Sequence, residues 1–444
     1  MFGLPTGAPT EPGAAEMHHN QRRARWAGLI GTALEQYDFV IYGTASALVF
    51  NTVFFPDVSA TVGYLGSFSA YAVGFFARPL GGLFFSRFGD RLGRKWVLVA
   101  TLALMGTATF AIGLLPGYAS IGFVAPVLLV LLRCAQGFGA GAEMAGGTVL
   151  LTETAPEGRR GRNAAMVWVG ASGGTALGAL VWLVVQLMPE EDLVSHGWRL
   201  VFFSSAAVTV LAFVLRRTLR DSHVFTETRK QAAVETSPIK DVWRNSRRNV
   251  LRVFAMVVGV SINSYIYQVF LGSYLVAEVQ VDKSVFTQSL LVGALAGMPA
   301  AYFFGWLSDR IGRRRAFTVV AVGMIAMPVP SYLLLDTGHP VLIALVIVLG
   351  FVFAAEGSVS AQAAFLPEIF GSRYRYAGVT LGREMASMVG GTGPLVCSAL
   401  VAWASGSWVP VAILMMAVTV VSLIATVRTP ETRDRDLYTE ADAA

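Results

Sequence analysis

Titratable side chains lie inside long apolar segments of this sequence, where charge is rare and costly. In segment 26–50, Glu35, Asp38 and Tyr42 follow Gly31 at offsets of four, seven and eleven residues. In a helix these offsets place all four residues on one stripe. A charged group at the centre of a membrane helix costs about 2.5 to 3.5 kcal/mol on insertion scales. The stripe is therefore a candidate functional surface that faces a water-filled cavity.

A second apolar segment, 121–152, supplies the complementary charge, Arg133. An arginine beside a carboxylate in a low-dielectric site favours the ionised carboxylate, and its departure favours proton uptake. We predict that Asp38, assisted by Glu35, takes up a proton and thereby frees Arg133. The alternative is a permanent ion pair that ties two helices together.

Two further charged residues lie in the first half of the chain, Arg78 in segment 60–86 and Glu143 in segment 121–152. Two interpretations stay open for Arg78: its guanidinium reaches a cavity, or it extends along the helix toward the membrane interface. Glu143 either pairs with Arg78 or serves as a second proton site. The sequence does not choose between these alternatives.

The second half of the chain carries Glu356 in segment 340–367, and Arg383 and Glu384 in segment 377–403. These three residues are candidates for substrate specificity. An arginine can bind a carboxylate through two parallel hydrogen bonds, so a carboxylate-bearing substrate suits this set. The alternative is that Arg383 and Glu384 neutralise each other or Glu356.

Uncharged polar residues complete the candidate binding set. Tyr42, Gln136, Asn263 and Tyr267 could hydrogen-bond a polar solute, although an aromatic packing stripe would also explain the tyrosines. The acids predicted to be buried argue against a simple anion site. They are Glu35, Asp38, Glu143, Glu356 and Glu384.

The segments that must position these residues are membrane helices. Of 444 residues, 55% are hydrophobic and only 14% are charged, against roughly 25% charged in an ordinary soluble domain. A soluble enzyme is therefore excluded, and a barrel would need alternating segments of about 10 residues. We predict an all-α polytopic membrane protein with twelve transmembrane helices in two six-helix halves. The predicted helices are 26–50, 60–86, 95–115, 121–152, 163–187, 199–215, 251–277, 285–308, 316–334, 340–367, 377–403 and 408–427.

The basic residues predict the orientation of the chain. Most of the 34 Lys and Arg residues fall in the connections on the side of both termini, whereas the opposite connections hold only Arg199 and Lys283. The positive-inside rule then places both termini in the cytoplasm and the protein in the cytoplasmic membrane. The net charge of +6 is thereby explained without a nucleic-acid partner.

An internal repeat divides the chain. The loop 89–95 recurs as 308–314, about half a chain later. The repeat predicts a tail at 1–20, bundles at 21–215 and 251–427, a linker at 216–250, and a tail at 428–444. Charged residues in and near the repeated loops are predicted to form a gate between the halves. They are Asp90, Arg91, Arg94, Glu153, Asp309, Arg310, Arg313, Glu368 and Arg375.

These motifs resemble the major facilitator superfamily. The two D-R-x-G-R-[KR] loops are similar to its signature, and Arg133-Cys134-Ala135-Gln136-Gly137 resembles its R-x-x-Q-G element. The runs Glu35 to Phe39 and Phe75 to Gly82 resemble its metabolite:proton symporter family, which includes shikimate, 2-oxoglutarate, citrate and proline/betaine transporters. The resemblance implies a coupling pair of a first-helix acid and a fourth-helix arginine. It also implies that the loop clusters hold the halves together in the outward-open state.

We therefore expect a secondary active transporter that imports a small polar organic metabolite, a carboxylate or a zwitterion, by proton symport with alternating access. The alternative is a proton-coupled antiporter that exports drugs or metabolites. A G-x-x-x-G-P-x-x-G-G pattern in segment 163–187 would favour it, and the proline of that pattern is missing. Enzyme chemistry, a cofactor and a metal are not expected, since the five histidines show no ligand spacing. The expected partners of this monomer are substrate, protons and membrane lipids.

Overall fold

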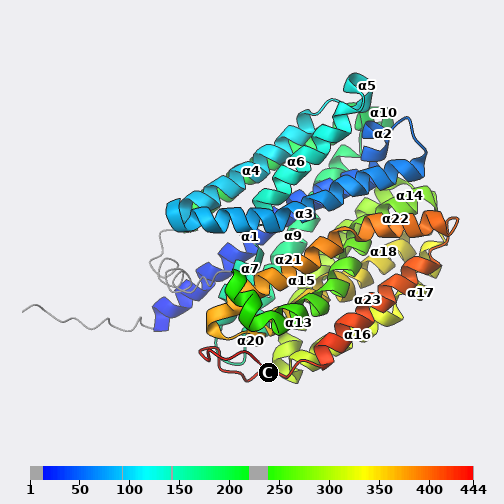
Figure 1. Cartoon of the computed structure of the whole chain (residues 1–444). Coiled ribbons are helices and arrows are strands. Elements are labelled where there is room, and N and C mark those ends of the chain that lie inside the picture. The colour runs from blue at the N-terminus through cyan, green and yellow to red at the C-terminus, as the bar shows by residue number, and fades with distance from the viewer. Residues whose placement is uncertain (1–13, 93, 142–143, 220–238, 444) are drawn as a thin grey trace, which may run out of the picture.

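The computed structural model describes the backbone of residues 14–92, 94–141, 144–219 and 239–443 (Figure 1). Some side chains within these ranges are not described, namely those of 14–28, 30, 83, 86–99, 144–146, 212–219 and 239–240. The predicted residues Asp90, Arg91, Arg94 and Glu143 fall outside the described side chains. The same holds for most of the predicted linker.

The first half of the chain contains six long helical rods joined by short turns. The rods are α1 (Ala14–Leu48), α3 (Ala60–Leu92), α4 (Arg94–Leu114), α6 (Val124–Ala140) with α7 (Met144–Glu153), α8 (Arg160–Ala164) with α9 (Met166–Val185), and α11 (Trp198–Leu219). The short elements between them are α2 (Phe50–Phe54), α5 (Tyr118–Ile121), α10 (Glu190–Asp192) and the π-helical turn η1 (Leu193–Gly197).

The second half repeats this plan with more interruptions. Its rods are α13 (Ile239–Tyr265) with η2 (Ile266–Phe270) and α14 (Leu271–Ala277), α15 (Lys283–Ile311), α16 (Arg313–Ala326) with α17 (Pro328–Leu335), α18 (Pro340–Gly350) with η3 (Phe351–Ala355), α19 (Glu356–Gln362) and α20 (Phe365–Ile369), α21 (Arg375–Gly391) with α22 (Gly393–Trp403), and α23 (Val409–Val427). A short 3-10 turn, η4 (Ser372–Tyr374), precedes α21.

Length and apolarity support a membrane location for these rods. Among the described residues, seven helices are long and apolar enough to cross a membrane, or eight if the bent pair α16 and α17 is one span. Two further apolar helices, Ala100–Leu114 and Val124–Ala140, are shorter. The described chain is helical throughout its regular structure and contains no strand.

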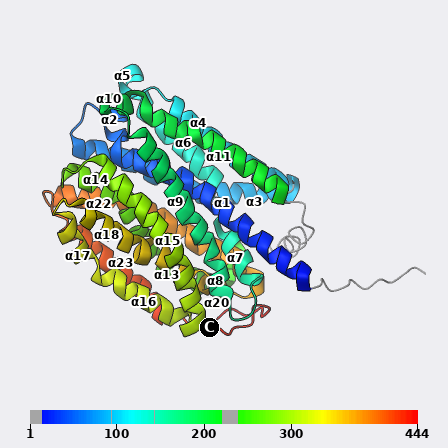
Figure 2. The ribbon, with the colours of Figure 1, turned by 180° about the vertical axis from the view of Figure 1, so that it is seen from behind.

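The rods form two bundles that pack side by side (Figures 1 and 2). The helices up to α11 make the first bundle, and those from α13 onward make the second. Contacts between the bundles run along α9 with α15, α3 with α21 and α22, and α1 with η2 and α14. Residues on these facing helices are therefore the ones that a movement of one bundle against the other would separate.

Two features of the rods differ from the sequence prediction. Helix α1 begins at Ala14, before the predicted start at residue 26, because the polar residues there continue the helix beyond its apolar part. The π-helical turns η2 and η3 interrupt the seventh and tenth rods. A π-turn adds a residue to the helix and rotates the side chains that follow it, and such turns are frequent at functional sites.

Candidate substrate and proton site

Arg133 is fully buried on α6 and is held by aromatic rings. Its guanidinium carbon lies 4.2 Å from the ring centroid of Tyr42 and 4.9 Å from that of Tyr71. The rings of Phe39 and Phe75 are 5.0 and 5.7 Å away. A cation over an aromatic face is stabilised by the negative face of the ring, and the effect is larger in a dry site. The rings thus hold Arg133 in place without a carboxylate partner.

The hydrogen bonds of Arg133 are incomplete. Its Nη1 donates to Oε1 of Gln136 at 2.5 Å, and Nε2 of Gln136 donates to Oγ1 of Thr109 at 2.8 Å. Its Nε and Nη2 have no hydrogen-bond partner in the described part of the chain. Buried donors without partners are costly, so the site is prepared for a group that the protein itself does not supply.

Small residues create the space for this arginine. A Cβ atom added to Gly74 on α3 would lie 2.6 Å from Nε of Arg133. A Cβ atom on Gly137 of α6 would lie 1.9 Å from the carbonyl oxygen of Gly74. The clash at Gly137 is with backbone, so α3 and α6 reach their close approach only with glycine there, whereas a side chain at position 74 would displace the guanidinium of Arg133.

Asp38 lies on α1 with only 5% of its surface exposed. Its Oδ1 accepts a 2.6 Å hydrogen bond from Oγ of Ser205 on α11. Among the described side chains, Asp38 forms no ion pair, so the predicted direct contact with Arg133 is absent from this structure. The reason is that Asp38 faces α11, whereas Arg133 lies over the rings of Phe39 and Tyr42. The coupling role of both residues stays a prediction.

Arg78 is fully buried on α3 and connects the two bundles. Its Nε lies 3.0 Å from Oε2 of Glu384 and its Nη2 lies 3.2 Å from Oε1 of the same residue, which belongs to α21. Its Nη2 is also 3.7 Å from Oε1 of Glu35 on α1. Arg78 therefore points into the protein, not toward the membrane interface. The same contacts show that Glu384 is paired with Arg78, and among the described residues it forms no ion pair with Arg383.

Arg383 lies on α21 over an aromatic residue of the first bundle. Its guanidinium carbon is 4.7 Å from the ring centroid of Trp168 on α9, and only 8% of the residue is exposed. No acid forms an ion pair with Arg383 in the part of the chain that the structure describes. The indole Nε1 of Trp168 is itself buried without a hydrogen-bond partner.

Glu356 begins α19, directly after the π-helical turn η3, and is 3% exposed. Neither its Oε2 nor Oγ of Ser172 on α9 has a hydrogen-bond partner among the described atoms. Both residues border Gly297 of α15, where an added Cβ atom would lie 2.4 Å from Oγ of Ser172 and 2.9 Å from Cγ of Glu356. Helices from both bundles therefore meet around this carboxylate.

Asn263 and Tyr267, which were predicted as substrate contacts, form hydrogen bonds within the second bundle in this structure. Nδ2 of Asn263 donates to the carbonyl of Gly259 at 2.8 Å and to Oγ1 of Thr419 on α23 at 3.1 Å. The hydroxyl of Tyr267 lies 3.4 Å from Oγ of Ser331 on α17. The two residues do share one helical face, but that face packs inside the second bundle.

The residues that face the first bundle are instead Tyr265 and Gln268. Oε1 of Gln268 accepts a 3.1 Å hydrogen bond from Nε2 of Gln36 on α1. The ring of Tyr265 lies 5.0 Å from that of Phe75. Gln268 lies within the π-helical turn η2, which a helical wheel with 3.6 residues per turn does not represent. Gln36 and Gln268 were not predicted, although polar residues in apolar segments are a detectable signal.

The predicted gate residues whose side chains are described lie at the end of the molecule formed by the loops at 153–162, 308–315 and 368–375, which we call the arginine-rich end. Nε and Nη2 of Arg313 each lie 2.9 Å from an oxygen of Glu368, and Nη1 lies 2.9 Å from Oδ1 of Asp309. These three residues belong to the second bundle. Arg313 and Glu368 are almost completely buried, at 1% and 0% exposure.

Two contacts carry this cluster across to the first bundle. The carboxylate of Asp309 accepts hydrogen bonds from the backbone N–H groups of Gly161 at 2.7 Å and Arg162 at 2.9 Å. Nη1 of Arg375 lies 2.6 Å from Oε1 of Glu153. Arg310 was predicted to join the gate, but it is exposed and stacks on Trp306 at 5.0 Å. Its position on the outer face of α15 prevents it from reaching the acids.

The C-terminal segment was predicted only as a tail, yet residues 428–443 pack against the gate as a strap. Glu431 accepts hydrogen bonds from the backbone N–H groups of Arg313 at 2.9 Å and Arg314 at 3.1 Å. Nη1 of Arg160, on the first bundle, donates to the carbonyl of Arg435 at 2.6 Å. The carbonyl of Leu437 accepts a hydrogen bond from Arg375. The strap thus contacts both bundles at the arginine-rich end.

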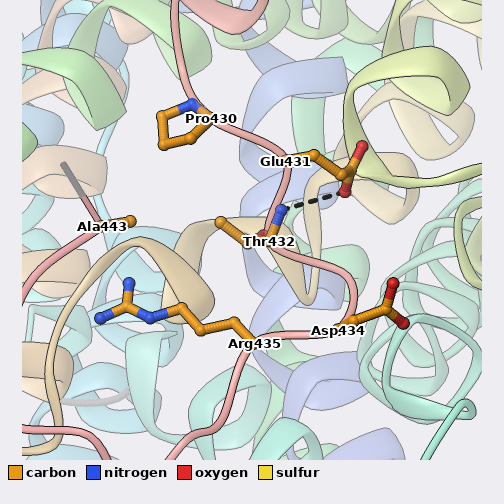
Figure 3. A pocket seen from close by; sticks show the side chains of 6 residues that line it. All are labelled: Pro430, Glu431, Thr432, Asp434, Arg435 and Ala443. Atoms are coloured by element: carbon orange, nitrogen blue, oxygen red, sulfur yellow. Dashed lines mark hydrogen bonds between the residues drawn. The ribbon is translucent and has the colours of Figure 1, made fainter.

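A pocket of about 430 Å³ is lined by residues of the strap (Figure 3). Figure 3 shows Thr432 donating its backbone N–H to the carboxylate of Glu431 at 3.0 Å. Burial lowers the pKa of the Arg435 guanidinium from its usual value, and the neighbouring Arg375 adds to this effect. The pocket is lined by Pro430, Glu431, Thr432, Asp434, Arg435 and Ala443.

The model of the Major Facilitator Superfamily matches residues 29–381. The chain belongs to the Major Facilitator Superfamily. It is 35% identical to the shikimate transporter of Escherichia coli, over 89% of this chain and 91% of the relative. It is also 34% identical to an inner membrane metabolite transport protein of E. coli, over 93% and 94% of the two chains. The proline/betaine transporter of Salmonella typhimurium is 29% identical over 95% and 86%.

A solved structure supports the same fold. The crystal structure of a D-xylose-proton symporter superposes with a TM-score of 0.70 at 18% identity, over 94% of this chain and 99% of the other. The predicted resemblance to superfamily metabolite transporters and the predicted all-α fold are therefore confirmed. This member of the Major Facilitator Superfamily is a multi-pass membrane transporter, not an enzyme.

Proposed function

We propose that this transporter imports a small polar organic metabolite together with protons by alternating access. The observation that carries the proposal is Asp38, a carboxyl group with only 5% of its surface exposed that accepts a hydrogen bond from Ser205 and has no cation paired with it among the described residues. A buried carboxylate without a counter-ion is costly, and protonation removes that cost. Relatives named as shikimate and proline/betaine transporters support a polar organic solute.

Arg133 is the second member of the coupling site. Its guanidinium lies over the ring of Tyr42. Tyr42 follows Asp38 by one helical turn on α1. Two of its nitrogens lack partners, so a movement of α1 or α6 can bring the carboxylate of Asp38 to them. In one state Asp38 is protonated and Arg133 is free, and in the other the two residues pair. The proton is thereby released to the side to which the site is then open.

The arginine-rich end is the cytoplasmic end in this proposal, since basic connections remain in the cytoplasm. Contacts between the bundles close this end, through Asp309 with the backbone of Gly161 and Arg162 and through Glu153 with Arg375. In this proposal the described state is the one in which the cytoplasmic gate is shut. The buried pair of Arg78 with Glu384 also joins the two bundles and must break when the gate opens.

Uptake into proteoliposomes tests the proposal. The purified chain is reconstituted, and uptake of labelled shikimate, succinate, citrate, proline and glycine betaine is measured with and without an inward proton gradient. We expect at least one solute to accumulate only when the gradient is present, and to acidify the lumen as it enters. Proton exit on solute entry would instead indicate the antiporter. The proposal fails if uptake of every transported solute is indifferent to the gradient.

A further inference from the structure

The central charges of the two bundles divide into paired and unpaired groups. Arg78 is paired with Glu384 and lies near Glu35. Arg383 and Glu356 are different: neither forms an ion pair with an opposite charge within the described residues. Each is more than nine-tenths buried, with exposed fractions of 8% and 3%. A buried ion without a partner is strongly unfavourable, so each of these residues has the properties of half of a binding site.

The two unpaired charges face the same helix of the opposite bundle. Arg383 stacks on Trp168, and Glu356 lies beside Ser172 at Gly297. Trp168 and Ser172 are four residues apart on α9, so they are successive positions on one helical face, about 6 Å apart along the axis. A cation and an anion of the second bundle are therefore presented along one stripe of the first.

Polar atoms along the stripe also lack partners. They are Nε1 of Trp168, Oγ of Ser172 and Oε2 of Glu356, all buried. An unsatisfied buried polar group costs about 1 to 3 kcal/mol, and hydrogen bonds from a ligand would remove that cost. The π-helical turn η3 ends at Ala355 and rotates Glu356 toward this position. These observations indicate a ligand that supplies both hydrogen bonds and charge.

Building on the proposed function, we propose that Arg383 and Glu356 bind the two ends of a zwitterion, a molecule that carries both an ammonium group and a carboxylate. Arg383 binds the carboxylate through its N–H groups. Glu356 binds the ammonium group. A dicarboxylate would place a negative group against Glu356, and an uncharged sugar would leave both ions unpaired. The zwitterion is therefore the substrate class that satisfies the whole stripe.

Isosteric ligand pairs test this assignment on the full-length protein in detergent. Proline is compared with cyclopentanecarboxylate, which has the same ring and carboxylate but no nitrogen. Glycine betaine is compared with 3,3-dimethylbutyrate, in which carbon replaces the quaternary nitrogen. We expect the dissociation constant of at least one zwitterion to be ten-fold or more below that of its isostere. The two arms distinguish a protonated ring amine from a quaternary ammonium group.

Variants then locate the two ends. Glu356→Gln should remove the preference within the pair, with at least a ten-fold loss for the zwitterion and little change for the isostere. Arg383→Gln should weaken both members of the pair. Glu356→Asp, which keeps the charge, should retain the preference. Glu190→Gln is the matched control. Glu190 is an exposed acid that pairs with Lys283 at the end of the molecule opposite the arginine-rich end, away from Glu356.

The outcomes separate this inference from the proposed function. If neither zwitterion is preferred to its isostere by the wild-type protein, the inference is overturned. If shikimate or succinate is nevertheless taken up with protons, the proposed function stands without it. If Glu356→Gln folds and keeps the full preference for the zwitterion, Glu356 is not its ammonium site.

Discussion

The arginine-rich end and the centre of the molecule both contain buried charges, but the two regions treat them differently. At the arginine-rich end, Arg313 contacts both Glu368 and Asp309, and Asp309 is further held by two backbone N–H groups of the other bundle. At the centre, Arg133 and Glu356 keep polar atoms without hydrogen-bond partners. The completed network can hold the bundles together, whereas the incomplete one is ready to receive a proton or a solute.

The largest effect is expected where the network is most complete. Arg313→Ala leaves Glu368 and Asp309 without their cation, and breaking a buried pair in this way costs about 3 to 5 kcal/mol. We expect a strongly lowered thermal unfolding temperature in detergent and no transport. The control is Arg310→Ala on the neighbouring exposed arginine, which should keep both stability and uptake. Normal stability of the Arg313 variant would contradict the comparison.

A second substitution removes a charged contact between the bundles at the centre. Glu384→Gln deprives the buried Arg78 of its two-oxygen partner, a loss of about 2 to 5 kcal/mol for a desolvated pair. We expect uptake to fall by at least ten-fold. Glu35→Gln removes the longer 3.7 Å contact and should have a smaller effect. Uptake measured for both variants in parallel shows which substitution causes the larger loss. A larger loss of uptake in Glu35→Gln than in Glu384→Gln would contradict this prediction.

The strap offers a way to loosen the gate without changing its charges. Deletion of residues 435–444 removes the carbonyl groups that bind Arg160 and Arg375, each worth about 0.5 to 1.5 kcal/mol. The measurement uses Ser172→Cys in both the deletion variant and the full-length chain. We expect its thiol to react several-fold faster in the deletion variant with a thiol reagent added from the arginine-rich end. Deletion of residues 441–444 alone is the control, because the strap contacts of Asp442 and Ala443 lie within the second bundle. Equal rates for both deletions would show that the strap does not hold the gate.

The smallest effect concerns a neutral hydrogen bond between the bundles. Gln36→Leu removes the 3.1 Å bond to Gln268, for which about 0.5 to 1.5 kcal/mol is typical. We expect at most a few-fold change in the uptake rate and no change in its dependence on the proton gradient. A complete loss of transport would mean that this glutamine pair belongs to the binding site itself.

The sequence predicted the rods and the charged cluster around Arg313, Glu368 and Asp309. Apolar segment lengths determine the rods, and the repeated loop motif marks the cluster directly. The structure shows no ion pair between Asp38 and Arg133, although the sequence predicted one. Residue spacing predicts which side chains share a face of one helix, but not how that face is rotated relative to another helix. The contacts of Asn263 and Tyr267 within the second bundle were not predicted for a similar reason, since residue spacing does not reveal which face of the seventh rod packs inside its own bundle.

Other parts of the site had weaker signals in the sequence. The strap is polar and rich in charge, so it resembles a solvated tail, and only its contacts with Arg160 and Arg375 reveal its place. The contribution of Trp168 and Ser172 depends on which helix of the second bundle lies opposite them. The packing of the two bundles determines which helix lies opposite α9, and no local sequence pattern predicts that packing.

The most direct test of the coupling site compares two modes of transport in Asp38→Asn. Asparagine keeps the size of the side chain and its acceptor for Ser205, but it cannot carry the proton. With the solute that the wild-type protein accumulates, we predict no accumulation under a proton gradient, while exchange of labelled for unlabelled solute persists at equal pH. Full uphill accumulation by this variant would contradict the account.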